Sequence, residues 1–387
     1  MSDVKPGDGW MLRKFVLLVI VGVSQCSRYP QPNYLALLLA SASTVSQNPV
    51  KSVYSFVTNV ATNPTLMTVP AVDTARAFVM CSYRLANTSF QTNRVPICSL
   101  TSSTQVTVQA GTSDAGVLVR GYVVEFSTGV NVQRGAFTLA GGTLNNTVSI
   151  SPVSQNRSFV IVQSRTTDTG TLIDEHRTVM GYLQSSSSLY VVRNQATIIT
   201  DVEYQVIEMQ GATVQYGISQ IPGGSFSVSI PIAAVNTSKS FVVFSSAADN
   251  LSNGNDSEMA VRCDLASASQ LSCQRQDSTN APDIAWYVVS FADSTYVERG
   301  SADTNVFTPP ANNTDTSMTV TPSVPFDLTR TLPIGSTASD PGDADAGLDS
   351  ASFTQHLLTS TQLNIQRGSA DDRRSVVSWQ LIQFPAR

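Results

Sequence analysis

The stretch IAWYVVSF at Ile284–Phe291 has the pattern of a β-strand, and the chain closes on a near copy, VSWQLIQF, at Val377–Phe384. Successive side chains of a strand point to opposite faces, so Tyr287 and Val289 share one face and Trp286 lies on the other. Both faces carry apolar side chains, which predicts that the strand is central in a sheet. The question is why the chain ends on a strand that it has already used.

This strand recurs in step with other markers along the whole chain. Its four copies are GYVVEF (Gly121–Phe126), YQVIEM (Tyr204–Met209), WYVVSF (Trp286–Phe291) and WQLIQF (Trp379–Phe384). Three further markers keep the same order: a VQRG-type segment (Val132–Gly135, Val214–Gly217, Val297–Gly300), an SFV-type segment (Ala77–Val79, Ser158–Val160, Ser240–Val242), and a Leu followed ten positions later by an Arg (Leu183 and Arg193, Leu265 and Arg275, Leu357 and Arg367). Markers that repeat at a fixed period of about 80 residues indicate a repeat protein.

Each repeat opens on the VQRG-type segment and ends on the aromatic strand. Four repeats fit the chain, at residues 51–127, 130–210, 212–293 and 295–387, after an N-terminal part at residues 1–50. Short runs of alternating apolar residues between Gly, Asn, Asp and Ser turns, without helical periodicity, predict antiparallel β-sandwiches. The fold class we predict is therefore all-β, with four tandem antiparallel β-sandwich repeats of about 80 residues. The linkers of a few residues predict a stiff rod of these repeats.

The composition fits such a fold and argues against several functions. The chain is 42% apolar but only 13% charged, with a formal net charge of −5. Typical soluble domains are about 25% charged. Because no cluster of Lys and Arg with interleaved aromatic residues occurs, we expect no nucleic-acid partner.

The N-terminus has the features of an export signal. Arg13 and Lys14 precede the apolar run Phe15–Val23, and a second apolar run follows at Leu35–Ala40. A short basic region before a short apolar run is typical of a signal peptide. Neither run reaches the roughly 18–20 residues of a membrane span, so we expect none. Three interpretations stay open: cleavage of the signal, lipidation at Cys26, and a buried N-terminal element.

The repeats resemble a known lectin module. The order of the strands, the Asp-bearing loop after SFVVFSS (Ser240–Ser246) and the closing strand VSWQLIQF are similar to the H-type lectin module, a small six-stranded sandwich. The resemblance implies a carbohydrate site built at a trimer interface. A covalent tandem array departs from that assembly, so only the fold is carried over to this chain and no binding residue.

Four cysteines have positions that suit disulfides. Cys98 and Cys263 occupy the same column of the repeat; Cys81 lies on the strand before Cys98, and Cys273 faces Cys263 across an expected hairpin. In an exported chain this predicts the disulfides Cys81–Cys98 and Cys263–Cys273. The alternative is four small buried thiols. Without a CxxC pair or a neighbouring His, a zinc site is not expected.

Candidate chemistry is sparse elsewhere. His176 and His356 fall in different columns, and no nucleophile-elbow or phosphate-loop motif occurs, so we expect no enzymatic activity and no catalytic residue. Glu125 and Glu208 share a column, which we interpret as the exposed end of a strand rather than a pair of catalytic acids.

Calcium is the one cofactor that the sequence suggests. Asp340, Asp343, Asp345 and Asp349 lie in one acidic, Gly-containing loop of the fourth repeat. Carboxylate oxygens are the ligands that calcium prefers. The spacing is not that of an EF-hand, so an ordinary solvated loop is the alternative interpretation.

Three functional hypotheses follow. The first is a secreted, non-enzymatic structural or adhesive protein of a bacterial surface, such as the subunit of an extracellular filament, which self-associates through its N-terminal segment at residues 31–49. The alternative for this segment is that it packs on the first repeat of its own chain. The second is a multivalent lectin that binds surface glycans with four weak sites. The third is a phage tail or receptor-binding protein, which should lack an export signal.

Overall fold

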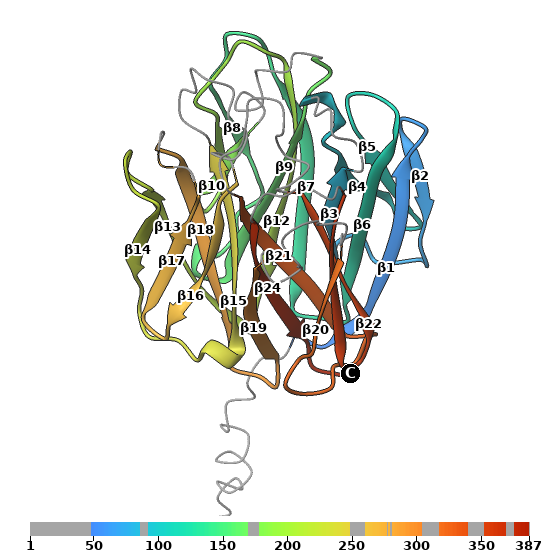
Figure 1. The fold of residues 1–387 in the computed structure, drawn as a ribbon, viewed down its shortest axis with the longest axis vertical. Coiled ribbons are helices and arrows are strands. Elements are labelled where there is room, and N and C mark those ends of the chain that lie inside the picture. The colour runs from blue at the N-terminus through green and yellow to red at the C-terminus, as the bar shows by residue number, and fades with distance from the viewer. Residues whose placement is uncertain are drawn as a thin grey trace, which may run out of the picture. The chain divides into compact units, whose positions relative to one another are not determined.

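The strands that the sequence predicts are present throughout the computed structural model, which describes residues 48–85, 92–168, 178–247, 260–276, 278, 281–303, 317–339, 352–368 and 375–386. These residues form β-strands with short 3₁₀ turns, and all belong to one unit, Ser46–Arg387. The predicted fold class is confirmed, because the strands make four successive antiparallel sandwiches, called modules 1 to 4 (Figure 1).

The strands fall into four sets of six. Module 1 contains β1 (Val50–Val60), β2 (Thr65–Thr68), β3 (Ala77–Leu85), β4 (Ile97–Ser102), β5 (Gln105–Gln109) and β6 (Asp114–Phe126). Module 2 contains β7 (Val130–Leu139), β8 (Asn145–Ser149), β9 (Ser158–Arg165), β10 (Met180–Ser185), β11 (Ser188–Val192) and β12 (Thr200–Met209). Module 3 contains β13 (Ala212–Gln220), β14 (Ser227–Pro231), β15 (Ser240–Ala247), β16 (Arg262–Ser267), β17 (Gln270–Gln274) and β18 (Asp283–Phe291). Module 4 contains β19 (Tyr296–Asp303), β20 (Ser317–Val320), β21 (Thr331–Ser339), β22 (Phe353–Thr359), β23 (Gln362–Arg367) and β24 (Ser375–Gln383). The 3₁₀ turns are η1 (Thr92–Arg94), η2 (Gln155–Arg157) and η4 (Thr237–Lys239).

Every module has the same topology. Its first, sixth and third strands form one three-stranded sheet, and its second, fifth and fourth strands form the other. The repeated aromatic strand is the sixth, and it is the central strand of its sheet (β6, β12, β18 and β24). In module 4 this strand, β24, joins the first and third strands, β19 and β21.

A glycine and an aromatic ring face each other across the first and sixth strands. Gly300 pairs with Trp379, and a Cβ added to Gly300 would lie 2.5 Å from the ring carbon Cζ2. The same pairing occurs in the other modules, with the two residue types exchanged between strands in module 1: Gly135 with Tyr204, Gly217 with Trp286, and Gly121 with Phe56. The glycine of the VQRG marker therefore leaves the space that the ring occupies.

The Arg that ends the Leu-to-Arg marker is buried. Arg193 is 0% exposed and donates hydrogen bonds to the backbone oxygens of Ala140, Thr143 and Ile198. Its counterparts Arg275 and Arg367 are 2% and 0% exposed. A guanidinium has five donors in a planar fork, which suits it to tie several loop carbonyls together. The marker is thus a structural feature of modules 2, 3 and 4, whereas module 1 has Ala110 at this position.

The modules are not arranged as the predicted rod, because module 4 contacts module 1. The N–H of Val50 donates to the carbonyl of Pro385 and the N–H of Val53 to that of Thr329. Figure 1 shows the red strands of module 4 beside the blue and blue-green strands of module 1. The rod prediction is therefore wrong, and the contacts between modules close into a circle.

Six phenylalanine rings explain this closure. Each contacts the next with ring centroids 5.1–6.2 Å apart, in the order Phe78, Phe159, Phe241, Phe291, Phe384, Phe126 and back to Phe78. All six are nearly fully buried, in one apolar core to which all four modules contribute. The second apolar face of the aromatic strand belongs to this shared core. Its burial drives the modules together.

Two kinds of junction alternate around the circle. At the junctions of modules 1 and 2 and of modules 3 and 4, a buried glutamine of the sixth strand makes hydrogen bonds to both the backbone N–H and the backbone carbonyl of one residue in the neighbouring module. Gln205 accepts from the N–H of Val79 at 2.9 Å and donates to its carbonyl at 2.7 Å, and Gln380 does the same to Val242 at 2.9 and 3.1 Å. Modules 1 and 3 carry Tyr122 and Tyr287 at this position.

At all four junctions the fourth strand of one module packs against the third strand of the next, as β4 does against β9 and β16 against β21. β10 contacts β15 and β18 at the junction of modules 2 and 3, and β22 contacts β3 and β6 at the junction of modules 4 and 1. Because the junction glutamines alternate with Tyr122 and Tyr287, the chain consists of two similar pairs of modules.

Candidate functional site

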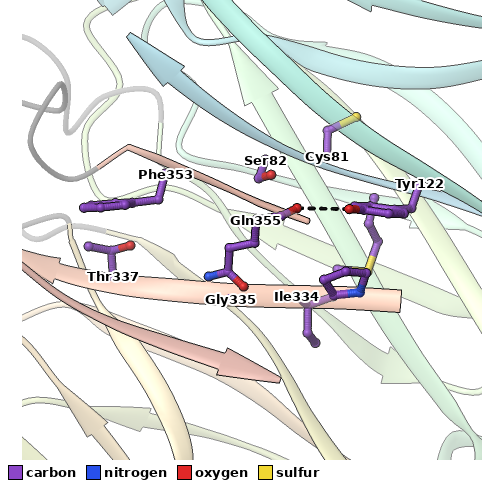
Figure 2. Close-up of a pocket in the computed structure, with 10 residues that line it drawn as sticks. Cys81, Ser82, Tyr122, Ile334, Gly335, Thr337, Phe353 and Gln355 are labelled. Atoms are coloured by element: carbon purple, nitrogen blue, oxygen red, sulfur yellow. Dashed lines mark hydrogen bonds between the residues drawn. The ribbon is translucent and has the colours of Figure 1, made fainter. Parts of the chain in front are cut away.

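A cleft lies where module 4 meets module 1. It is lined by Met80, Cys81 and Ser82 of β3, Tyr122 of β6, Pro333, Ile334, Gly335 and Thr337 of β21, and Phe353 and Gln355 of β22, and its volume is about 70 Å³ (Figure 2). The hydroxyl of Tyr122 donates to the backbone oxygen of Gln355 at 3.0 Å and closes one side. Burial raises the pKa of Tyr122, so this hydroxyl stays protonated and acts as the donor.

The cleft exists because module 4 lacks an apolar side chain that the other modules have. Gly335 occupies the position on the third strand where modules 1 to 3 carry Cys81, Val162 and Phe244. Figure 2 shows the Gln355 amide reaching into the space beside Gly335, and a Cβ there would collide with it. Module 4 therefore has a buried polar amide where the other modules have apolar packing.

The cleft is polar but uncharged. The Gln355 side chain belongs to a residue that is 4% exposed, and its Oε1 has no hydrogen-bond partner among the described residues. Ser82, Thr337 and Tyr122 add hydroxyls, and no lining residue is charged. A neutral ligand or a water molecule could satisfy the amide oxygen.

The cleft adjoins a wider cavity of about 260 Å³. The two share Cys81, Ser82, Gly335, Thr337 and Phe353, and the wider cavity extends to module 3. Its size is just below the range of about 300–1,000 Å³ that is usual for drug-sized ligands. The two cavities together can hold a small neutral molecule.

The disulfides that the sequence predicts are both present. Cys81 bonds to Cys98, which joins the two sheets of module 1, and Cys263 bonds to Cys273 within the β16–β17 hairpin. Disulfides persist in oxidising compartments, which agrees with an extracellular location. Among the described residues, no helix is long and apolar enough to cross a membrane.

We expect the double substitution Cys81→Ser, Cys98→Ser to lower the free energy of unfolding by about 3 kcal/mol, because a disulfide across 17 residues restricts the unfolded chain. Urea unfolding with and without a reductant measures this. A reductant should shift the wild-type midpoint further than that of the variant, which keeps only Cys263–Cys273. Equal shifts would contradict a contribution from the first disulfide.

The interpretation of Glu125 as the exposed end of a strand is wrong. Its side chain is 1% exposed, accepts the N–H of Asp73 at 2.8 Å and pairs with Lys51 at 2.8 Å. Glu208 accepts the N–H of Ser154 in the same way at 2.9 Å, and Gln383 that of Asp327 at 2.6 Å. In modules 1, 2 and 4 the side chain at this position therefore holds the loop before the third strand, whereas Ser290 of module 3 bonds to the hydroxyl of Ser240. The sequence pattern could not show this, because each acceptor lies some 50 residues from its donor.

The remaining candidate residues lie outside the described part of the chain. These are the lipidation candidate Cys26, His176, and the calcium candidates Asp340, Asp343, Asp345 and Asp349. Within the described ranges, no group of three or more His, Cys, Asp or Glu side chains has a metal-binding arrangement. The calcium and lipidation predictions stay untested.

Sequence reasoning did not find the cleft itself. Gly335 reads as an ordinary strand glycine, and Gln355 as one of the polar residues of β22. A comparison of the third strands column by column would have singled out Gly335, since the other modules carry larger side chains there.

Asp327 gives module 4 a measurable response to acid. Its carboxylate accepts hydrogen bonds from Thr329 and Arg330, which lower the pKa of Asp327 to about 2. The folded pKa lies below the unfolded value of 3.8, so this stabilisation is present above pH 4 and is lost as the pH falls towards 2. We expect Asp327→Asn to reduce the loss of stability between pH 4 and 2, measured by acid unfolding. Asn236 makes the same turn in module 3 without a carboxylate, so the substitution should fold. An unchanged acid response would contradict this role.

Comparisons with known proteins give no family for the chain. A scan against protein-family models finds no match, and a search of curated protein sequences finds none either.

Proposed function

We propose that the chain is a secreted, non-enzymatic structural or adhesive protein of a bacterial surface. The observation that supports this best is that the residues which recur in the repeats have structural roles. The paired glycines and rings, the buried arginines and the junction glutamines all serve packing within or between modules. A repeat whose recurring residues stiffen the fold suits a protein that bears load or presents a surface.

Self-association through the N-terminal segment remains part of this proposal. The described part of the chain begins at Asn48, which limits where a deletion of this segment can end. Asn48 is fully buried, its N–H faces the carboxylate of Asp293 at 3.4 Å, and its Oδ1 accepts the N–H of Gly211 at 3.3 Å. Asn48 therefore belongs to the folded modules, and a deletion that tests self-association has to end before it.

The test is a deletion of residues 31–47, compared with a deletion of residues 2–10 as the control. The self-association proposal requires that the 31–47 deletion gives folded monomers with normal melting, while the control still associates. Sedimentation velocity and electron micrographs of native material measure this. If the 31–47 deletion associates like the control, the segment is not the contact between subunits.

The polar, uncharged lining of the cleft favours a second candidate function, a carbohydrate-binding protein of the kind that the resemblance to H-type lectin modules implies. Gly335 and Gln355 occur together in module 4 alone, which supports one site and argues against four equivalent ones. Calorimetric titration with neutral monosaccharides tests this, with Thr337→Val to remove one lining hydroxyl. Binding that is identical in both proteins would place any sugar site elsewhere.

A further inference from the structure

The junctions between modules 2 and 3 and between modules 4 and 1 have the same backbone but opposite chemistry. At the junction of modules 2 and 3, Met180, Ala247 and Ala285 are buried together, with Tyr182 and Val192 packed against them. This junction is apolar, as a contact between two folded modules usually is at its centre.

The corresponding positions at the junction of modules 4 and 1 are polar and cationic. Arg120 pairs with Ser82 as Ala285 pairs with Ser245, so Arg120 replaces Ala285. Arg84 stands at the eighth position of β3, where β15 has Ala247.

On the facing strand, β22, the exchange is similar. His356 pairs with Asn364 as Tyr182 pairs with Tyr190, and Thr354 takes the place of Met180. An apolar patch has thus become a cluster of two arginines, a histidine, a threonine and an asparagine.

The polar atoms of this cluster are incompletely satisfied. Arg120 Nε, Thr354 Oγ1, His356 Nδ1 and Asn364 Oδ1 are buried without a hydrogen-bond partner among the described residues. Arg84 donates one hydrogen bond, from Nη1 to the backbone oxygen of Arg367 at 3.2 Å. Buried polar atoms normally have partners, so several unpaired ones in one place indicate a missing partner.

The two arginines of the cluster lack a negative partner among the described residues. No ion pair joins Arg84 or Arg120 to a carboxylate in the described part of the chain. Burial and then the charge of Arg120 lower the pKa of Arg84, and burial followed by the charges of Arg120 and Arg84 lowers the pKa of His356 to about 4. The histidine is therefore neutral at pH 7, and two half-buried guanidinium groups repel each other without compensation.

We propose that the junction of modules 4 and 1 binds a small oxyanion between Arg84 and Arg120. Planar guanidinium groups bind phosphate, sulfate and carboxylate groups with paired hydrogen bonds. Thr354 and the neutral His356 supply uncharged donors beside them. Because both arginines are only partly buried, an anion can reach them from solvent. The bound anion would strengthen the contact that closes the circle of modules.

The test is the melting temperature of the full chain at pH 7.5 in sodium phosphate and in sodium chloride of the same ionic strength. We expect phosphate at a hundredfold excess over its dissociation constant to raise the melting temperature by about 3–5 °C. Arg84→Ala and Arg120→Ala, which install the residues of the apolar junction, should remove this shift. Arg157→Ala, at an exposed arginine of module 2, should keep it. Acetate in place of phosphate shows whether a carboxylate serves as well as a tetrahedral anion.

A conservative variant distinguishes a loss of anion binding from a loss of folding. Arg120→Lys keeps the charge but loses the paired geometry, so it should weaken phosphate binding at least tenfold by calorimetric titration while the protein folds normally. Equal melting temperatures in phosphate and chloride, or a phosphate shift that survives both alanine substitutions, would overturn the proposal. If a segment of the chain itself occupied the site between the arginines, the melting temperatures in phosphate and chloride would be equal.

Discussion

Trp379→Ala should lower the free energy of unfolding by about 3–5 kcal/mol, the usual cost of deleting a large buried aromatic side chain. The ring is 6% exposed and lies over Gly300, which has no side chain to fill the space that the ring leaves. Urea unfolding followed by circular dichroism measures the loss, because the substitution removes a fluorescent residue.

Leu66→Ala is the control, since Leu66 is 58% exposed on β2 and its truncation should change stability by less than about 0.5 kcal/mol. A loss for Trp379→Ala as small as that of the control would show that the ring is not packed in the core of module 4.

Gln380→Ala should destabilise the protein by about 2–5 kcal/mol, although it removes no apolar group. It leaves the buried N–H and carbonyl of Val242 without partners, and each unpaired buried group costs about 1–3 kcal/mol. The equivalent Gln205→Ala should have a similar effect at the junction of modules 1 and 2. Both measurements are equilibrium unfolding curves.

Gln215 offers a matched control. It makes the same pair of hydrogen bonds, to the N–H and carbonyl of Ala233, but at the surface and within one module. Water can replace both bonds there, so Gln215→Ala should cost less than about 1 kcal/mol. Equal losses for Gln215→Ala and Gln380→Ala would mean that the junction glutamines contribute no more than surface hydrogen bonds.

The fold of one module could be predicted from the sequence, because its signals are local or strictly repeated. Alternating apolar residues define each strand, and the recurrence of IAWYVVSF as VSWQLIQF shows that the last strand completes a module. The two disulfides also followed, since Cys263 and Cys273 flank a hairpin turn and Cys81 and Cys98 lie on successive strands of one repeat.

The arrangement of the modules could not be predicted in the same way. Phe291 and Phe384 show only that the aromatic strand has a second apolar face, and a period of two does not say which sheet covers it. Short linkers suit a rod and a closed circle equally well. The contacts that join module 4 to module 1, such as that between Tyr122 and Gln355, link residues more than two hundred positions apart.

The candidate sites depend on this arrangement and were missed for the same reason. Arg84, Arg120 and His356 belong to two modules, and nothing in the sequence places them together. The one available signal is an exception to the repeat. These positions are charged or polar in one pair of modules and apolar in the other, which becomes visible only when the register of the strands is known.

A distance between modules 1 and 4 tests the central claim most directly. Spin labels at Ser55→Cys on β1 and at Leu328→Cys, in a chain with Cys26→Ser, report it by pulsed electron paramagnetic resonance. Ser55 is two residues from Val53, whose N–H bonds to the carbonyl of Thr329, next to Leu328. With a rise of about 3.3 Å per strand residue, the closed circle predicts a distance below about 25 Å between the labels. In a rod, modules 2 and 3 would lie between the labelled modules, and the labels would be on the order of 40 Å or more apart. A distribution centred there would contradict the closed arrangement.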